Sequence, residues 1–418
     1  MKYKISALVI TLFFILSTTL SARIVLPPID GPIIRRIPIA VPDLLGSGSD
    51  PRAREFVDVL RNDLKNAGLF DVSTGGGISL GSGDNINYQA FFEAGEEALV
   101  KGEFQTGGGK IAITAKLFDV VGEKFLVGRS YESNSARVRD AAHRFANVVM
   151  KELTGIDGFF TSRIAFVSGT EDMRDLFIMD YDGFGLRRIT SHRALVLSPS
   201  CSPDGNKILF NSDKVFDQDL YIMTINAQNS EKRLTKTFRL EQSPEWSPDG
   251  TRMAFSAAGD IYVANPDGTN AVNITRHSAI DVSPVWSPDG RQIAFTSDRS
   301  GSPQIYIMSA SGGSARRVSS GSYNTDPSWS PNPAVNKIAF VRVGSGANIF
   351  TVNPDGSGET QLTNGGRNEN PSWSPDGHYI AFMSSRGGTR DIYLMYLSGE
   401  NVVQLTKGSG KAFPTWCR

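Results

Sequence analysis

Short apolar segments separated by turn residues recur with a regular period from residue 163 to residue 418. In one copy, four such segments lie at 283–287, 292–296, 304–308 and 316–319. The third segment places β-branched and aromatic residues on a two-residue period, which is the pattern of a β-strand. After the first segment, Pro288-Asp289-Gly290 provides the residues that reverse a chain tightly. Each copy therefore predicts a unit of four short strands.

The copies follow one another at the spacing of propeller blades. Successive copies lie 45, 40, 43, 44 and 43 residues apart, measured between Pro199, Pro244, Pro284, Pro327, Pro371 and Pro414. Six units at this period predict a six-bladed β-propeller. The array starts at Arg163 with a second strand and stops at Arg418 after a first strand, so we expect one blade to combine both ends. The copy at 330–336 has two extra residues, and we expect its turn to have a different shape.

Before the repeats, the pattern changes to that of a small α/β domain. Apolar residues along one face predict a helix over 51–67, ended by Gly68, and a second helix is predicted over 136–153. Strands are predicted at 97–102, 110–120 and 124–131, the last two joined by a hairpin. The Pro- and Ile-rich segment 23–43 fits either an edge strand or a docking arm. The predicted fold is thus an α/β domain over residues 23–155, followed over residues 156–418 by an all-β six-bladed β-propeller with Trp-Ser-Pro-Asp-Gly repeats.

The first 22 residues have the three parts of a secretory signal peptide. Lys2 and Lys4 precede an apolar run from Ile5 to Leu16, and small residues follow at 21–22. The alternative is a membrane anchor, but a spanning helix needs about 20 apolar residues, and polar residues interrupt this run from Ser17. We therefore expect residues 1–22 to be removed and the mature protein to be exported.

The charge balance excludes two classes of partner. The chain has 43 basic and 43 acidic residues, and removal of the signal peptide takes away two lysines. A nearly neutral chain has no electrostatic footprint for nucleic acid or for an anionic membrane surface. Beyond the signal peptide we find no segment suited to membrane insertion.

The two cysteines are too few for a disulfide framework. Cys201 stands where other copies carry Trp, and Cys417 follows Trp416 by one residue. If the ring closes, their strands belong to neighbouring blades, and an oxidising compartment permits a bridge. An offset of one residue, however, turns side chains of a strand to opposite faces. We therefore favour two small buried hydrophobic side chains and leave the disulfide open.

The catalytic and metal-binding motifs fail in their context. The sequence at 77–81 matches Gly-x-Ser-x-Gly, but glycines surround it where a nucleophile elbow needs a strand and a helix. Of four histidines, only His192 and His277 lie on the expected channel face, and no Cys or carboxylate cluster at ligand spacing accompanies them. We expect no catalytic residue, no cofactor and no metal ion.

His192 and His277 occupy the same position in two copies, two residues after the Thr that ends a fourth strand. The loops that carry them cross to the next blade, and all such loops should surround one mouth of the central channel. The candidate binding residues on these loops are His192, Arg193, Arg276, His277, Ser278, Asp281, Tyr323 and Arg367. Loops between second and third strands should add Asp213, Lys214, Asp298, Arg299, Arg342 and Arg386. A rim rich in Arg, His and Tyr suits protein recognition.

The export signal, the α/β domain and the six Trp-Ser-Pro-Asp-Gly blades together resemble the TolB family, the periplasmic components of the Tol–Pal system. The junction at 153–167 is also similar to that family. The resemblance implies a non-catalytic periplasmic adaptor that maintains outer-membrane integrity and supports envelope constriction during cell division. It further implies that the rim binds the lipoprotein Pal, and that an N-terminal arm with Arg23, Ile24, Val25 and Leu26 binds TolA.

A second hypothesis remains: an exported propeller enzyme or carbohydrate-binding protein that uses the central channel. The blade motif also occurs in propellers of prolyl-oligopeptidase-type enzymes and of some secreted lyases. Against a peptidase, no hydrolase segment follows the blades in this sequence. Against a metal-dependent lyase, only two histidines are expected on the channel face.

Overall fold

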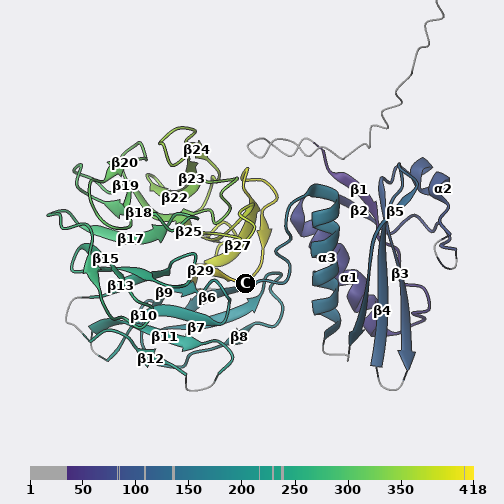
Figure 1. Ribbon diagram of the computed structural model, residues 1–418, viewed down its shortest axis with the longest axis horizontal. Coiled ribbons are helices and arrows are strands. Elements are labelled where there is room, and N and C mark those ends of the chain that lie inside the picture. Colours follow the sequence, from purple (N-terminus) through teal and green to yellow (C-terminus); the bar gives the residue numbers. More distant parts are fainter. Residues whose placement is uncertain are drawn as a thin grey trace, which may run out of the picture.

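The computed structural model describes residues 35–81, 83, 85–107, 110–133, 137–215, 217–227, 230–236, 240–408 and 410–418. The predicted signal peptide and the arm residues Arg23, Ile24, Val25 and Leu26 lie outside these residues. An α/β domain stands beside a β-propeller, and the chain passes once from the first to the second (Figure 1). None of the helices in the described part of the chain is both long enough and apolar enough to cross a membrane.

The N-terminal domain is a five-stranded sheet with two long helices on one face (Figure 1). Its strands, in the spatial order β2-β1-β3-β4-β5, are β2 (Phe70–Ser73), β1 (Ile37–Ala40), β3 (Ala98–Gly107), β4 (Lys110–Asp119) and β5 (Lys124–Ser133). The helices are α1 (Pro51–Ala67), α2 (Tyr88–Glu93) and α3 (Val138–Thr154). Helices α1 and α3 bury their apolar faces against the sheet in one shared core.

The predicted helix over 51–67 is confirmed to the residue. Asp50 caps its first turn by accepting the backbone N–H of Arg52 at 2.9 Å. Gly68 ends it in the left-handed conformation with φ of 71°, which glycine adopts without strain. In the segment 23–43, the prediction of an edge strand is wrong, because β1 lies between β2 and β3.

The propeller consists of six four-stranded antiparallel sheets. From the inner to the outer strand, the first blade is β9 (Val196–Cys201), β10 (Lys207–Val215), β11 (Asp217–Thr224) and β12 (Lys232–Arg233). The second is β13 (Gln242–Trp246), β14 (Met253–Ala257), β15 (Asp260–Ala264) and β16 (Val272–Asn273). The third is β17 (Asp281–Trp286), β18 (Gln292–Ser297), β19 (Gln304–Ser309) and β20 (Arg316–Arg317).

The remaining blades have the same order. The fourth is β21 (Asn324–Trp329), β22 (Ile338–Val343), β23 (Ala347–Val352) and β24 (Thr360–Gln361). The fifth is β25 (Asn368–Trp373), β26 (Tyr379–Ser384), β27 (Asp391–Tyr396) and β28 (Val403–Gln404). The closing blade is β29 (Lys411–Cys417), β6 (Arg163–Gly169), β7 (Arg174–Asp180) and β8 (Arg187–Arg188).

The closing blade confirms that both ends of the repeat array share one sheet. Strand β29 pairs antiparallel with β6, so that Trp416 lies opposite Ile164. The Trp416 indole N–H donates to the carbonyl of Ser372 in the fifth blade at 3.0 Å, and Trp373 bonds the carbonyl of Ser328 in the same way. Trp286 bonds the carbonyl of Glu245 likewise, so three of the tryptophans tie a blade to the one before it, whereas the Trp329 indole donates to Asn336 of its own blade.

Cys201 and Cys417 form a disulfide, with Cα atoms 5.2 Å apart, so the preference for two unpaired side chains is wrong. The offset of one residue, which the sequence suggested would separate the two side chains, in fact brings them together. Strands β29 and β9 belong to different sheets that pack face to face, so the two facing side chains come from opposite faces of their own sheets. Trp416 points back to the fifth blade, and Cys417 therefore points forward to Cys201 in the first blade.

The two domains share apolar and polar contacts. Phe159, in the connection between them, packs its ring against Tyr181, Tyr379 and Trp416 with centroids 4.3–5.6 Å apart. The Tyr379 hydroxyl donates to the carbonyl of Ala67 at the end of α1 at 2.7 Å. A single hydrophobic cluster runs through both domains at this junction.

Candidate partner-binding site

Two kinds of loop meet at one end of the propeller. In the third blade, Asp281 at the start of the inner strand pairs with Ser297 at the end of the second strand, and Ser297 pairs with Gln304 at the start of the third strand. The loops entering the inner strand and the loops joining the second and third strands therefore emerge together. We call this end of the propeller the mouth face.

A repeated polar anchor fixes the loops that cross between blades. Asp175, the second residue of β7, accepts the hydroxyl of Thr190 at 2.9 Å and the backbone N–H of His192 at 3.1 Å. In the second blade, Asp260 accepts the hydroxyl of Thr275 at 3.0 Å and the backbone N–H of His277 at 3.4 Å. The shared sequence position of the two histidines thus corresponds to a shared backbone geometry.

The two imidazoles nevertheless differ in their surroundings. His192 is partly buried, with Nε2 2.7 Å from a carboxylate oxygen of Glu231, which also pairs with Lys214. Burial lowers the pKa of His192, and the charge of Lys214 adds to this effect. His277 is exposed, and its Nδ1 accepts the backbone N–H of Ala279 at 3.0 Å. Of these two histidines, only His277 has an exposed imidazole ring.

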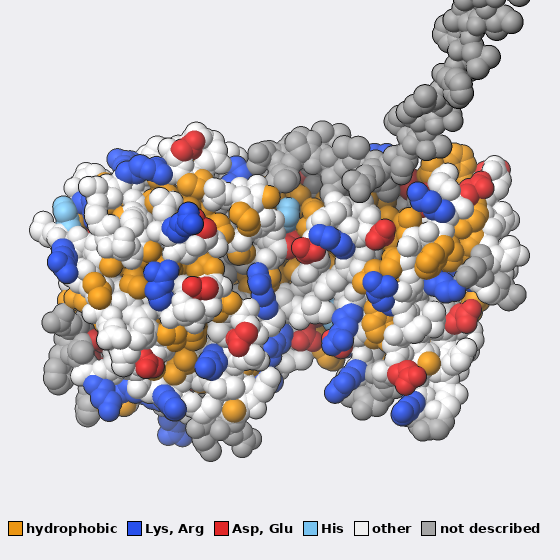
Figure 2. Space-filling view, in the orientation of Figure 1, with side chains coloured by type: hydrophobic (Ala, Val, Ile, Leu, Met, Phe, Trp, Pro, Cys, Tyr) orange, Lys and Arg blue, Asp and Glu red, His pale blue; other side chains and the backbone are white. Residues whose placement is uncertain are grey.

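The other rim residues are mostly where the sequence predicts them. Arg193, Arg276, Ser278, Tyr323 and Arg367 are all exposed on crossing loops. The Arg367 guanidinium donates to Glu369 through Nε at 2.9 Å. Basic and acidic side chains are interspersed on both domains over the face shown in Figure 2.

Asp281 is the exception, because its side chain is fully buried and not available to a partner. Its two carboxylate oxygens each accept a bond from Arg299 at 3.0 Å. Asp281 therefore positions Arg299 and exposes no group of its own. The sequence could not show this burial, because it placed Asp281 on the crossing loop. In the structure, Asp281 is instead the first residue of the inner strand β17.

Three successive blades hold an arginine in the same way. Arg299 and Arg386 follow a second strand, and Arg342 is the last but one residue of β22. Each donates to the first residue of the inner strand, namely Asp281, Asn324 or Asn368. Their guanidinium groups lie 4.1–5.4 Å from the aromatic ring of the adjacent third strand. These side chains are thus fixed before any partner arrives.

Tyr323, which the sequence predicts for the rim, is joined there by exposed apolar side chains that the sequence did not predict, among them Leu240 and Ile280. Leu240, Ile280 and Tyr323 occupy one repeat position, four residues before the repeated proline, and are 56%, 59% and 44% exposed. Met173, in the loop that joins β6 to β7, and Val215, the last residue of β10, are also exposed. The sequence did contain a signal for these side chains, because large apolar residues in a predicted loop lie outside the alternating pattern of the strands. Exposed apolar groups beside fixed arginines are typical of protein interfaces.

The central channel is narrow. A cavity of about 140 Å³ is lined by the inner strands, including the repeated prolines and the residues on either side of them. The residue before each proline has φ between 47° and 55°, in a bulge that all six blades share. Burial raises the pKa of Glu245 to about 7 and that of Asp326 to about 6 in this channel. Ligand pockets usually measure about 300–1,000 Å³, so this space is small for a saccharide.

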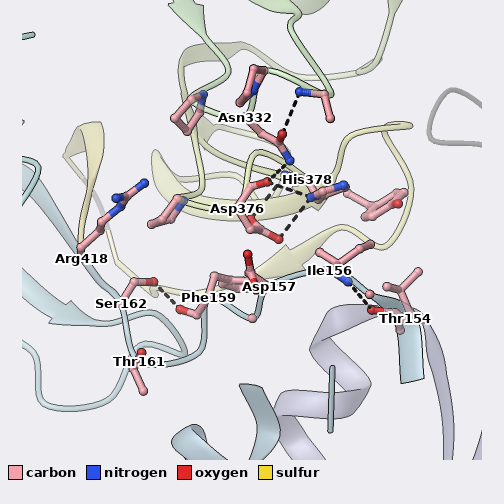
Figure 3. A pocket seen from close by; sticks show the side chains of 18 residues that line it. Thr154, Ile156, Asp157, Phe159, Thr161, Ser162, Asn332, Asp376, His378 and Arg418 are labelled. Atoms are coloured by element: carbon pink, nitrogen blue, oxygen red, sulfur yellow. Dashed lines mark hydrogen bonds and ion pairs between the residues drawn. The ribbon is translucent and has the colours of Figure 1, made fainter. Parts of the chain in front are cut away.

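A larger cavity, of about 970 Å³, lies where the two domains meet (Figure 3). The connection 154–159 forms one wall, and the turn 331–334 with Asp376 and His378 forms the other. Asn332 donates its side-chain amide to the carbonyl of Asp376 at 2.8 Å. The turn has the different shape predicted for it, since Asn332 accepts the N–H groups of both Val335 and Asn336. The cavity was not predictable, because its walls come from distant segments.

Comparison with known proteins identifies the family. Residues 150–418 match the family model described as the TolB beta propeller domain, and residues 28–126 match the TolB amino-terminal domain. The chain belongs to the TolB family. The crystal structure of TolB from Acinetobacter baumannii has a TM-score of 0.83 and 26% identity, and the match covers 92% of this chain and 97% of that one.

Curated TolB relatives support the same assignment. The Tol-Pal system protein TolB of Desulfosudis oleivorans is 34% identical over 288 residues, which are 65% of this chain and 65% of the relative. That of Syntrophotalea carbinolica is 34% identical over 166 residues, or 38% of each chain. The chain therefore spans less than two thirds of the length of these relatives. The α/β region and the six-bladed propeller are the TolB fold, while the individual rim residues stay predictions.

Proposed function

We propose that this TolB-family chain is a non-catalytic periplasmic adaptor of the Tol–Pal system, which binds the lipoprotein Pal on its mouth face. The observation that carries this proposal is the row of Leu240, Ile280 and Tyr323, exposed at one repeat position beside arginines that are already fixed. An interface of this kind gains free energy from apolar burial, and prepositioned arginines lose little side-chain entropy on binding. The function in outer-membrane integrity and envelope constriction during cell division would follow from this binding.

The narrow channel supports the adaptor over the second hypothesis. An exported enzyme or carbohydrate-binding protein that used the channel would need room for a sugar, and the channel offers about 140 Å³. Its two perturbed carboxyl groups, Glu245 and Asp326, are accounted for by burial among the inner strands. No further observation favours chemistry at this place.

A matched pair of variants tests the mouth face. Ile280→Ser should weaken binding of the soluble Pal domain about tenfold or more in calorimetric titration, because a central apolar contact is lost. Val272→Ser is the control, since Val272 is comparably exposed in the same blade but lies at the start of β16, at the opposite end of the blade. Equal affinities for both variants would place the Pal site elsewhere.

The proposed TolA site is tested separately. We propose that Arg23, Ile24, Val25 and Leu26 form the arm that binds TolA. Deletion of residues 23–26 should abolish binding of TolA and leave the affinity for Pal unchanged. Unchanged TolA binding would remove the arm from the proposal without affecting the Pal site.

A further inference from the structure

A buried polar cluster joins the two domains at a distance from the mouth face. Asp63 of α1 and His143 of α3 belong to the N-terminal domain, and their side chains bond through Oδ2 and Nδ1 at 2.8 Å. Tyr181 and Asp182, which follow β7, belong to the propeller. The Tyr181 hydroxyl donates to the other oxygen of Asp63 at 2.5 Å. The His143 ring thus lies beside Tyr181, the propeller residue that bonds Asp63, with the two ring centroids 5.7 Å apart.

The other ring nitrogen of His143 faces the propeller. Its Nε2 is 4.0 Å from a carboxylate oxygen of Asp182 and has no hydrogen-bond partner among the described residues. The side chains of His143, Asp63 and Asp182 are at most 6% exposed. In the neutral ring, Nδ1 carries the hydrogen atom and donates a hydrogen bond to Asp63. The lone pair of Nε2 then faces a second carboxylate, that of Asp182. Protonation turns Nε2 into a donor and makes both contacts attractive.

The charged groups around the ring favour a proton over a metal ion as the bridging group. The Arg139 guanidinium, on α3, already pairs with Asp182 and stacks over the ring of Phe184, 3.9 Å from its centroid. A metal ion bound to His143 and Asp182 would lie beside this fixed cation. From the propeller side, Asp180 is the further titratable group near His143.

We propose that His143 is a proton-controlled latch between the two domains: the imidazolium joins Asp63 of the N-terminal domain to Asp182 of the propeller, and loss of its proton releases the propeller side. The latch acts on the orientation of the two domains, whatever partner the protein binds, because α1, α3 and the β7–β8 turn are the elements that the cluster joins.

The electrostatics of the cluster agree with this geometry. Burial alone would lower the pKa of His143, but the hydrogen bond and charge of Asp63, together with the charge of Asp182, outweigh it and raise the pKa above the ordinary value. Burial also raises the pKa of Asp63. The pair therefore retains its shared proton to a higher pH than a free imidazole. A raised pKa means that the latch is fully present below the ordinary histidine pKa and is lost as the pH rises through the value in the folded protein.

The distance between the domains provides the first test. Spin labels are placed at Glu132→Cys in β5 and Ser311→Cys in the propeller of the oxidised protein, both exposed positions. Between about pH 6 and pH 9, the distribution of distances from pulsed electron paramagnetic resonance should broaden. Near the midpoint, the ratio of open to closed molecules should change about tenfold per pH unit, as for one linked proton.

Two histidine variants separate the latch from general titration. His143→Gln keeps a hydrogen-bonding side chain without a titrating ring, and it should remove the pH response. His378→Gln is the control, because His378 is equally buried at the domain junction but contacts Asp376 of its own blade. The same broadening in wild type and His143→Gln, or no broadening in wild type, would overturn the proposal.

A direct titration keeps the proposal testable even if His143→Gln does not fold. The ring ¹⁵N resonances of His143 in the full protein should report a midpoint above about 6.5, the ordinary value for histidine. A midpoint at or below that value would show that the ring is neutral when the domains are joined, and would overturn the latch.

Discussion

Cys201 and Cys417, separated by 216 positions in the sequence, are joined by a disulfide across the seam where the propeller ring closes. Cys201 lies at the end of β9 in the first blade, and Cys417 lies at the end of β29 in the closing blade. The covalent bond thus links the last strand of the chain to a neighbouring sheet, in addition to its hydrogen bonds with β6.

This bond predicts a dependence of stability on redox state. Cys201→Ala/Cys417→Ala should lower the free energy of unfolding by about 2–5 kcal/mol, because a long loop in the unfolded chain is no longer constrained. Thermal unfolding of the oxidised wild type and of the double variant measures the difference. Reduced wild type is the control and should resemble the variant. Equal melting temperatures of oxidised and reduced protein would speak against the bond.

The Asp281–Arg299 pair predicts unequal effects of two substitutions at one position. Asp281→Ala leaves Arg299 partly buried without its carboxylate and should cost about 3 kcal/mol of stability. Asp281→Asn should cost much less, since Asn324 and Asn368 hold Arg342 and Arg386 from the equivalent position. Denaturant unfolding of both variants decides this. Similar losses for Ala and Asn would mean that Asp281 acts through its charge alone.

The channel carboxyl group of Glu245 predicts a pH effect of defined sign. Burial raises its pKa to about 7, so folding disfavours the ionised form. Its stabilising contribution is present below the unfolded pKa and is lost as the pH rises through about 7. Glu245→Gln should therefore be more stable than wild type at high pH, by up to about 3 kcal/mol, and equal to it at low pH.

The comparison of melting temperatures across pH measures this effect. The other five copies carry neutral Ser, Val or Thr at the position of Glu245, so a neutral amide should pack there without strain. Asp289→Asn, in an exposed turn, is the control for loss of a carboxylate, because hydrogen bonds from Ser287 lower its pKa and its contribution has the opposite sign. A destabilised Glu245→Gln at high pH would contradict the account.

The architecture could be predicted because its signals are local and repeated. The turn Pro288-Asp289-Gly290, the position of Trp286 and the strand period each recur, so that one blade predicts the others. The helix over 51–67 carries its own cap at Asp50 and its own stop at Gly68. Strand β1 was harder to predict, because four residues including Pro38 give little periodic signal.

The site was only partly predictable, since its chemistry depends on contacts between distant segments. The sequence places His277 and Arg276 on an exposed loop, but it does not show that Asp281 is buried beneath Arg299. Predicting the disulfide requires knowing how two neighbouring sheets face each other. The alternation of side chains within one strand does not give that information. The latch around His143 joins α1, α3 and a propeller turn that lies 118 positions from Asp63.

The central claim is that a partner binds the mouth face, and amide hydrogen exchange with and without saturating soluble Pal domain tests it most directly. We predict slower exchange in the crossing loops 191–196, 240–242, 276–281 and 319–324, and unchanged exchange in the turns 203–206 and 248–251 at the opposite face. Protection confined to the opposite face or to the N-terminal domain, or no protection anywhere, would contradict the account.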